Sequence, residues 1–329
     1  MLPDFIGIIF TAFISLVIIN FSPLSGKLGF SIVLVLTAMV VSGLINLVRR
    51  DKKAAFNAVT TVLIYVTGTF LIIPVFSIVF EIIVRGVPGL SFGMFANDMS
   101  VTSADAAANE GGLLHAIIGT AYLIIFASLI SVPIGVLTAL YLTEIKGRFS
   151  STVRFFVQAM SGVPSVVAGL FIFAAIILTT PLKASGVVGA FSLSILMIPT
   201  VTRTAQEVLN LVPNDLREAG LAMGATQWRT VASIVVPAAR NGLLTATILG
   251  VARIAGETAP LIFTIGGSDK LNLNPFKDYQ GALPFYVWKG LLLGTPESIQ
   301  RAWTGILILL MLVLTLFTLA RRFGSRKAG

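Results

Sequence analysis

The sequence lacks several side chains on which enzymes and metal sites depend. Its 329 residues include no cysteine and a single histidine, His115. Disulfides and thiol chemistry are therefore excluded, and one histidine cannot supply the histidine cluster of a transition-metal site. No G-x-x-x-x-G-K-[ST] phosphate loop is present, so we do not expect this chain to bind ATP in that way. The sequence thus predicts no catalytic, cofactor-binding or metal-binding residue in this chain.

Charged residues are also scarce. They make up 11% of the chain, whereas a soluble domain carries about 25%. Hydrophobic residues make up 56%, and the mean hydropathy is +0.96. A chain this apolar needs lipid as its main solvent. Its net charge of +9 is better explained by basic cytoplasmic loops than by nucleic-acid binding.

Long apolar runs recur along the sequence. A helix needs about 20 mostly apolar residues to cross the hydrocarbon core of a membrane. Eight segments qualify, at about 5–21, 28–48, 59–84, 113–142, 153–178, 186–205, 240–267 and 303–320. Their apolar runs are too continuous for barrel strands, which alternate. The predicted fold is therefore an all-α, polytopic membrane helix bundle of about eight transmembrane helices. The first segment has no basic residue before it, so we expect a retained helix rather than a signal peptide.

The basic residues predict an orientation. Between the spans they divide into a set of fifteen on one side and a set of seven on the other. The larger set should be cytoplasmic, which puts both termini in the cytoplasm of a multi-pass cell-membrane protein. This set comprises Arg49, Arg50, Lys52, Lys53, Lys146, Arg148, Arg154, Arg203, Arg217, Arg229, Arg240, Arg321, Arg322, Arg326 and Lys327.

Two long segments, 85–112 and 268–302, would then lie outside the cell. They are either solvated connectors or a landing surface for an external partner.

Between the sixth and seventh predicted spans, we expect a short helix outside the membrane. Pro213 would end the incoming helix, because the residue before a proline avoids the helical region. Asp215 followed three residues later by Glu218 is the arrangement of a capping box. Gly224 suits the left-handed position that ends a helix, and Thr226 can cap the next helix, which re-enters the membrane.

The residues 218–237 read Glu-Ala-Gly, three residues, Gly, nine residues, Ile-Val-Val-Pro. This string resembles the EAA loop of ABC-importer permeases, whose pattern is Glu-Ala-Ala, Gly and Ile-x-Leu-Pro at these spacings. It departs from the pattern at Gly220, where Ala is usual, and at Val236, where Leu is usual. The resemblance implies that the helix near 215–224 docks on a separate ATPase subunit through a face of small residues. An interfacial helix on lipid headgroups is the alternative. The implied coupling residues are Glu218, Ala219, Gly220 and Gly224.

Two ionisable residues lie deep in the seventh predicted span. Arg253 is roughly 20 Å beyond Arg240, at a helical rise of about 1.5 Å per residue. Glu257 follows at i+4, on the same helix face, and ionisable residues at such depth are expensive and usually functional. Either the pair locks helix packing, or Arg253 lines a wet path where its planar fork contacts an anion.

Three stretches resemble the phosphate-specific ABC importer permeases, namely 161–171, 198–207 and 252–261. The Glu-Thr-Ala-Pro ending of the third is similar to the PstA-type subunit. The resemblance extends from about residue 59 to the C-terminus and implies a six-helix type I importer core over 59–329. Residues 1–58 would then be two extra N-terminal transmembrane helices and a basic cytoplasmic linker.

Under this resemblance, an anion pathway is expected at Arg253, Glu257, Thr258 and Arg203. Arg203 lies near the end of its span and could instead be an interface arginine. A helix break in mid-membrane is tolerated only against protein or a wet cavity, which suggests a gate or pathway wall at Gly162, Pro164 and Ser165. Three further residues at span ends are expected to be solvated or interfacial, namely Glu81, Glu144 and His115.

The resemblance implies a non-enzymatic permease subunit of an ATP-driven importer for inorganic phosphate, working by alternating access. The implied partners are a homologous PstC-type permease subunit, two copies of a PstB-type ATPase subunit and a PstS-type external phosphate-binding protein. ATP and Mg would be bound by the ATPase partner. A permease for sulfate or molybdate, an ion-gradient-driven secondary transporter and a signalling scaffold are the alternatives.

Overall fold

The computed structural model describes residues 11–19, 26–103, 105–107 and 109–325. These residues are predominantly helical, and within the same ranges no strand forms beyond one isolated bridge between Gly266 and Gln280. The all-α prediction is therefore confirmed.

The chain divides into two compact units, Met1–Glu81 and Ile82–Gly329. The first unit contains α2 (Gly26–Arg49) and most of α3 (Lys52–Gly86). Asp51 accepts a hydrogen bond from the Ala54 amide at 2.7 Å, which helps start α3. Residue 58, where we expected the N-terminal pair to end, lies within α3.

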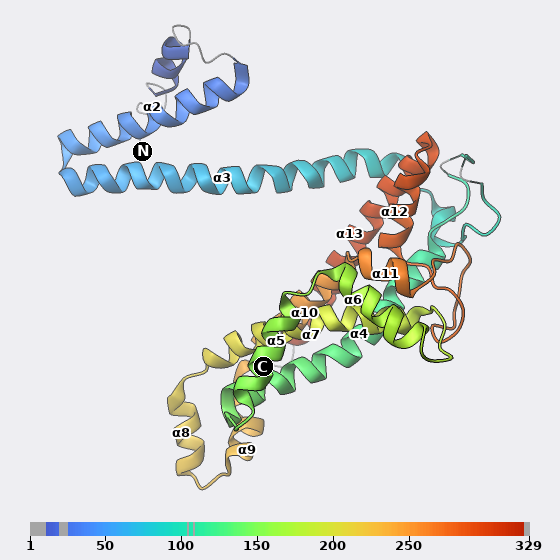
Figure 1. The fold of residues 1–329 in the computed structure, drawn as a ribbon. Helices are drawn as coiled ribbons and strands as arrows, with labels where there is room; N and C mark the ends of the chain where they lie inside the picture. The colour runs from blue at the N-terminus through green and yellow to red at the C-terminus, as the bar shows by residue number, and fades with distance from the viewer. Residues whose placement is uncertain (1–10, 20–25, 104, 108, 326–329) are drawn as a thin grey trace. The chain divides into compact units, whose positions relative to one another are not determined.

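The second unit is a helix bundle (Figure 1). Its long helices are α4 (Leu114–Leu140), α7 (Gly186–Asn210), α10 (Val236–Ala255) and α13 (Pro296–Ser325). Its shorter helices are α5 (Ser150–Ser161), α6 (Ser165–Ile172), α8 (Asn214–Ala222), α9 (Gln227–Thr230), α11 (Ala259–Thr264) and α12 (Leu283–Leu293).

Six helices within the described ranges are long and apolar enough to span a membrane, or seven if α5 and α6 form one broken span. The first predicted segment, 5–21, is helical at 11–19, and its remaining residues at both ends lie outside those described. The predicted break near Gly162 is confirmed, because the helices on either side are bent by 104°. The predicted span 240–267 is wrong at its end, because α10 stops at Ala255 and a short helix follows.

The core of the second unit forms where α4, α7 and α10 pack together. Leu123, Met197 and Ile254, one from each helix, are almost fully buried. Glycines allow the close approach: a Cβ on Gly135 of α4 or Gly250 of α10 would lie 2.9 or 2.7 Å from Val201 side-chain atoms. The core therefore ties three spans into one body.

The two segments predicted to lie outside the cell form one structure. The Met99 amide donates to the Asp269 carbonyl at 2.9 Å, and the Leu271 amide donates to the Asp98 carboxylate at 2.8 Å. Helix α12 lies within the second segment. The interfacial expectation for His115 is wrong, because this side chain is 1% exposed and packs edge-on against Tyr286 of α12.

Candidate coupling and translocation site

The short helix predicted between two spans is α8. Helix α7 ends at Asn210, before Pro213, as predicted. Gly224 adopts φ +81° beyond the end of α8, and the Thr226 hydroxyl accepts from the Arg229 amide at 3.4 Å, which caps α9. Both of these predictions are confirmed. The capping box is wrong, because α8 begins at Asn214 without a side-chain cap, which places Asp215 inside its first turn.

The predicted coupling residues do not share one face. Glu218, Ala219 and Gly224 are exposed, whereas Gly220 is buried. A Cβ on Gly220 would lie 2.7 Å from Cγ2 of Thr230 and 2.8 Å from Cδ1 of Ile234. The missing side chain of Gly220 therefore lets α8 pack against the following segment of its own chain, rather than seating α8 in a partner.

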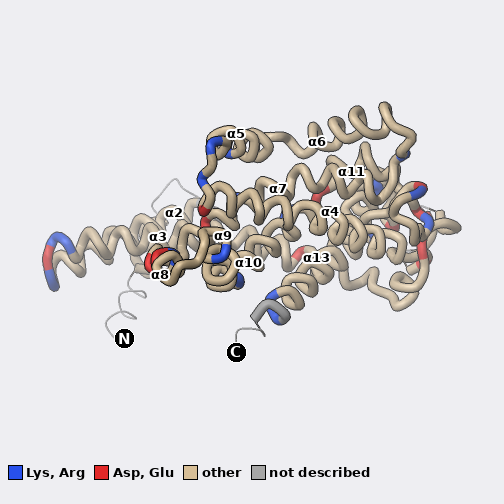
Figure 2. The backbone as a smooth tube through the Cα atoms, turned by 90° about the horizontal axis from the view of Figure 1, so that it is seen from below, with Lys and Arg blue, Asp and Glu red and all other residues tan. Residues whose placement is uncertain are grey.

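The free surface around α8 carries large apolar side chains. Met223 is 88% exposed and Trp228 is 63% exposed. Both belong to the α8–α9 region, where Figure 2 shows charged residues as well. A mixture of exposed apolar and charged side chains is typical of a protein-binding surface.

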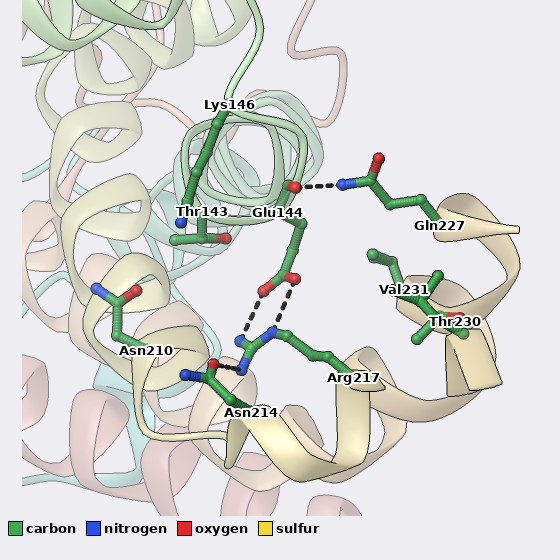
Figure 3. A pocket seen from close by; sticks show the side chains of 10 residues that line it. Thr143, Glu144, Lys146, Asn210, Asn214, Arg217, Gln227, Thr230 and Val231 are labelled. Carbon is green, nitrogen blue, oxygen red and sulfur yellow. Dashed lines mark hydrogen bonds and ion pairs between the residues drawn. The ribbon is translucent and has the colours of Figure 1, made fainter. Parts of the chain in front are cut away.

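An ion pair connects α8 to the end of α4. The guanidinium of Arg217 donates from Nε to Oε2 of Glu144 at 3.0 Å and from its NH2 nitrogen to Oε1 at 2.8 Å (Figure 3). The Glu144 side chain is 6% exposed. The expectation that Glu144 is solvated is therefore wrong. The hydrogen bonds to Glu144 raise the pKa of Arg217 above its ordinary value.

The same guanidinium also binds the segment that leaves α7. It donates to the carbonyl oxygens of Leu209 at 2.8 Å and Val212 at 2.6 Å, and to the Asn214 side chain at 3.2 Å. The Leu209 carbonyl belongs to the last turn of α7, where carbonyl groups have no partner within the helix. Arg217 thus joins the ends of two long helices to the start of α8.

A cavity of about 480 Å³ lies beside this ion pair. Figure 3 shows the lining side chains, which come from the end of α4, from α7 and from the α8–α9 segment. The lining residues are Thr143, Glu144, Lys146, Asn210, Asn214, Arg217, Leu221, Gln227, Thr230 and Val231.

The two predicted pathway residues of the seventh span separate at the end of α10. Arg253 is exposed and lies in the last turn, and Gly256 ends the helix. Glu257 and Thr258 are half-buried in the break before α11. The expectation of one shared helix face is therefore wrong. In the part of the chain that the structure describes, no hydrogen bond or ion pair joins the Arg253 and Glu257 side chains.

Arg203 faces a different cavity, of about 220 Å³. Arg154 and Gln158 of α5 and Gln206 of α7 line it with Arg203, and Arg253 does not. The structure therefore does not bring the two predicted pathway arginines to this cavity together.

The helix that follows the predicted gate, α6, contacts the helix that follows the pathway residues, α11. Gly162, Pro164 and Ser165 form the bend before α6. Further along α6, a Cβ on Gly169 would lie 2.6 Å from Cα of Pro260 in α11. This close approach joins the bend to the segment after Glu257. The described residues contain no group of three or more His, Cys, Asp or Glu side chains that could hold a metal ion.

The fold and the separate helix α8 agree with a sequence match to a known transport family. Residues 131–329 match the family described as binding-protein-dependent transport system inner membrane component. The chain belongs to this family of multi-pass membrane transport components.

Its relatives define the branch of the family. PstA, a phosphate transport system permease protein of Pasteurella multocida, is 39% identical over 76% of this chain and 88% of its own length. PstA 1 of Mycobacterium tuberculosis is 34% identical over 83% of this chain and 88% of its own length. A solved structure, the inward-facing MetNI methionine ABC transporter, aligns at 20% identity with a TM-score of 0.49, covering 65% of this chain and 95% of that chain. From the sequence matches, the chain is a PstA-type ABC permease.

Proposed function

We propose that this chain is the permease subunit of an ATP-driven importer of inorganic phosphate. The observation that carries the proposal is its 39% identity to a protein named a phosphate transport system permease, over most of both chains. The chain would form the translocation path with a homologous PstC-type permease subunit and move phosphate inward by alternating access.

The motor contact is proposed at α8. Glu218, Ala219 and Gly224 are exposed there, beside the exposed Met223 and Trp228. Two PstB-type ATPase copies would bind ATP and Mg, and one would dock on this surface. A PstS-type binding protein would deliver phosphate to the joined outer segments. No chemical step would occur in this chain.

The orientation is proposed from charge. In the second unit, basic residues of the larger set lie at the start of α5, around α8 and α9 and at the end of α13 (Figure 2). These segments gather toward one end of that unit, which supports a single cytoplasmic face with the C-terminus on it.

The anion path is proposed at Arg253 and Arg203, with Glu257 and Thr258 nearby. Arg253 is exposed, and among the described residues it makes no ion pair with Glu257, so its charge is available to an anion. The bend at Gly162, Pro164 and Ser165 is proposed as a gate, since α6, which follows the bend, packs against α11 at Gly169 and Pro260. Movement of α11 can therefore be transmitted to the bend through α6.

Cargo is tested by uptake into vesicles that hold the assembled complex. We expect ATP-dependent uptake of labelled phosphate and little uptake of labelled sulfate or molybdate. Absence of phosphate uptake, with uptake of another oxyanion, would show that phosphate is not the cargo.

The proposed contact between α8 and the ATPase is tested by a substitution at Glu218. Glu218→Lys places a cation on the exposed face of α8 and should abolish ATP-driven uptake, while the exposed Lys183→Gln on the opposite side should leave it unchanged. Uptake that survives Glu218→Lys and follows an ion gradient would indicate a secondary transporter.

A further inference from the structure

The attachment of α8 to the bundle depends on few polar contacts. Arg217 binds Glu144, the end of α7 and the start of α8 with five hydrogen bonds between 2.6 and 3.2 Å. Arginine has five N–H donors in a fixed fork, so these contacts use its full capacity. Lysine in its place could keep the charge but not the fork.

Glu144 receives a second contact from the same loop. The Gln227 side chain of α9 donates to the Glu144 backbone carbonyl at 2.5 Å. Glu144 lies in a π-helical turn, Tyr141–Ile145, which ends at Lys146 in a left-handed conformation. Both α8 and α9 are therefore anchored to one residue at the end of α4.

These contacts connect α8 to the spans noncovalently, in addition to its covalent connection along the chain. Along the chain, α8 is joined to α7 through Pro213 and to α10 through α9. The Arg217–Glu144 pair adds a direct connection to α4, and Glu144 is 73 residues from Arg217 in sequence. Helix α4 packs against α7 through the main core, so a force applied to α8 reaches the bundle at two helix ends together.

We propose that Arg217 and Glu144 are positioning residues that brace the coupling helix against the ends of α4 and α7, so that movement of α8 drives the spans. The proposal rests on the proposed function, because it assumes that an ATPase moves α8. We call the contacts of Arg217 with Glu144, with the end of α7 and with the start of α8 the brace. These contacts remain formed throughout the transport cycle. Without it, α8 moves with the ATPase while the spans lag, and ATP is consumed without transport.

The test measures ATP hydrolysis and phosphate uptake together, in vesicles containing the complete complex. We expect Arg217→Ala and Glu144→Gln to raise the ATP consumed per phosphate by about tenfold, within the range of measured coupling effects. Arg217→Lys should give an intermediate ratio. Lys146→Gln is the matched control, because it removes a charge from the same cavity but breaks no bond of the brace. Its ratio should stay unchanged.

A covalent cross-link between positions 144 and 217 distinguishes a positioning role of these residues from a general loss of stability in the variants. The chain has no cysteine, so in Glu144→Cys with Arg217→Cys the two introduced thiols are the only ones in this chain that a bifunctional thiol reagent can join. We expect the double variant to waste ATP before cross-linking and to recover the wild-type ratio afterwards. An unchanged ratio in Arg217→Ala and Glu144→Gln, or no recovery on cross-linking, overturns the proposal.

Measurements on the wild-type complex distinguish a failure of the proposed cargo from a failure of the proposed brace. If it carries an anion other than phosphate, the proposed cargo is wrong, and the same ratio measured with that anion still decides the brace. If it carries phosphate and the variants remain tightly coupled, only the brace is wrong.

Discussion

At the scale of single residues, the guanidinium groups of Arg217 and Arg253 have opposite surroundings. Arg217 is saturated by protein acceptors, and its partner Glu144 is nearly buried. Arg253 is exposed, and in the described part of the chain it makes no ion pair with Glu257. An arginine whose donors are all used by protein acceptors holds structure, whereas an exposed arginine in the last turn of a membrane-spanning helix is a candidate for contact with an anion. Mutations at the two positions should therefore fail in different ways.

Arg253→Gln should lower phosphate uptake by about tenfold or more, because one charge-assisted contact contributes about 1.5–3 kcal/mol. Arg253→Lys keeps the charge and should retain part of the uptake. The amount of co-purified ATPase should not change. Labelled uptake by the reconstituted complex measures the effect, and normal uptake in Arg253→Gln would remove this residue from the path.

Gly220→Ala should destabilise the chain by about 1–3 kcal/mol, because the added Cβ overlaps the stiff side chain of Thr230. Adding Thr230→Ser removes the methyl group 2.7 Å away and should restore part of the loss. The exposed Ala219→Ser is the control. Thermal unfolding of the purified complex measures the effect, and an unchanged midpoint in Gly220→Ala would contradict it.

At the scale of elements, the outer segments are held by backbone groups and a carboxylate. Asp98 accepts from the Leu271 amide at 2.8 Å and from the Ser100 amide and hydroxyl at 3.0 and 2.6 Å. Burial raises the pKa of Asp98, but these hydrogen bonds outweigh it and leave the pKa below the ordinary 3.8. The folded state thus favours the ionised carboxylate, which joins the two segments.

Asp98→Ala should lower stability by about 1–3 kcal/mol at pH 7, since a charged acceptor is lost. A lowered folded pKa means that this stabilisation is complete above the ordinary pKa and disappears as the pH falls through the folded value. The difference from wild type should therefore shrink below about pH 3.8. Unfolding curves at several pH values test this, with the exposed Asp105→Ala as the control, and a pH-independent difference would contradict it.

At the scale of the whole molecule, the spans and the two sets of loops should have one orientation in the membrane. The exposed Lys53 belongs to the larger basic set, and Val101, which is 95% exposed, belongs to an outer segment. In this cysteine-free chain, single Val101→Cys should react with an impermeant maleimide in intact cells, and single Lys53→Cys should react only after permeabilisation. The reverse pattern would mean that the proposed orientation is wrong.

Features that depend on neighbouring residues were predicted well. The apolar runs predicted most of the spans, because membrane helices require continuous apolar sequence. Gly224, Thr226 and the bend at Gly162 followed from local backbone preferences. The capping box failed by a shift of two residues, because the N-cap of α8 is Pro213 and not Asp215.

Features that depend on distant residues were missed. Glu144, at the end of a span, looked like a solvated carboxylate, and no local pattern pairs it with Arg217, 73 residues away. His115 looked interfacial because its burial is created by α12, which follows more than 150 residues later. The i+4 spacing of Arg253 and Glu257 was misleading because α10 ends between them.

The sequence by itself determined the class of protein, the membrane-spanning helices and the helix between two spans, because hydropathy, turn residues and motif spacing are local properties. The tertiary structure decided that Gly220 faces inward, that the outer segments join, and that Arg217 ties α8 to α4 and α7. These contacts exist only after chain segments far apart in sequence pack together, and their polar groups then lose water and must find partners in the protein.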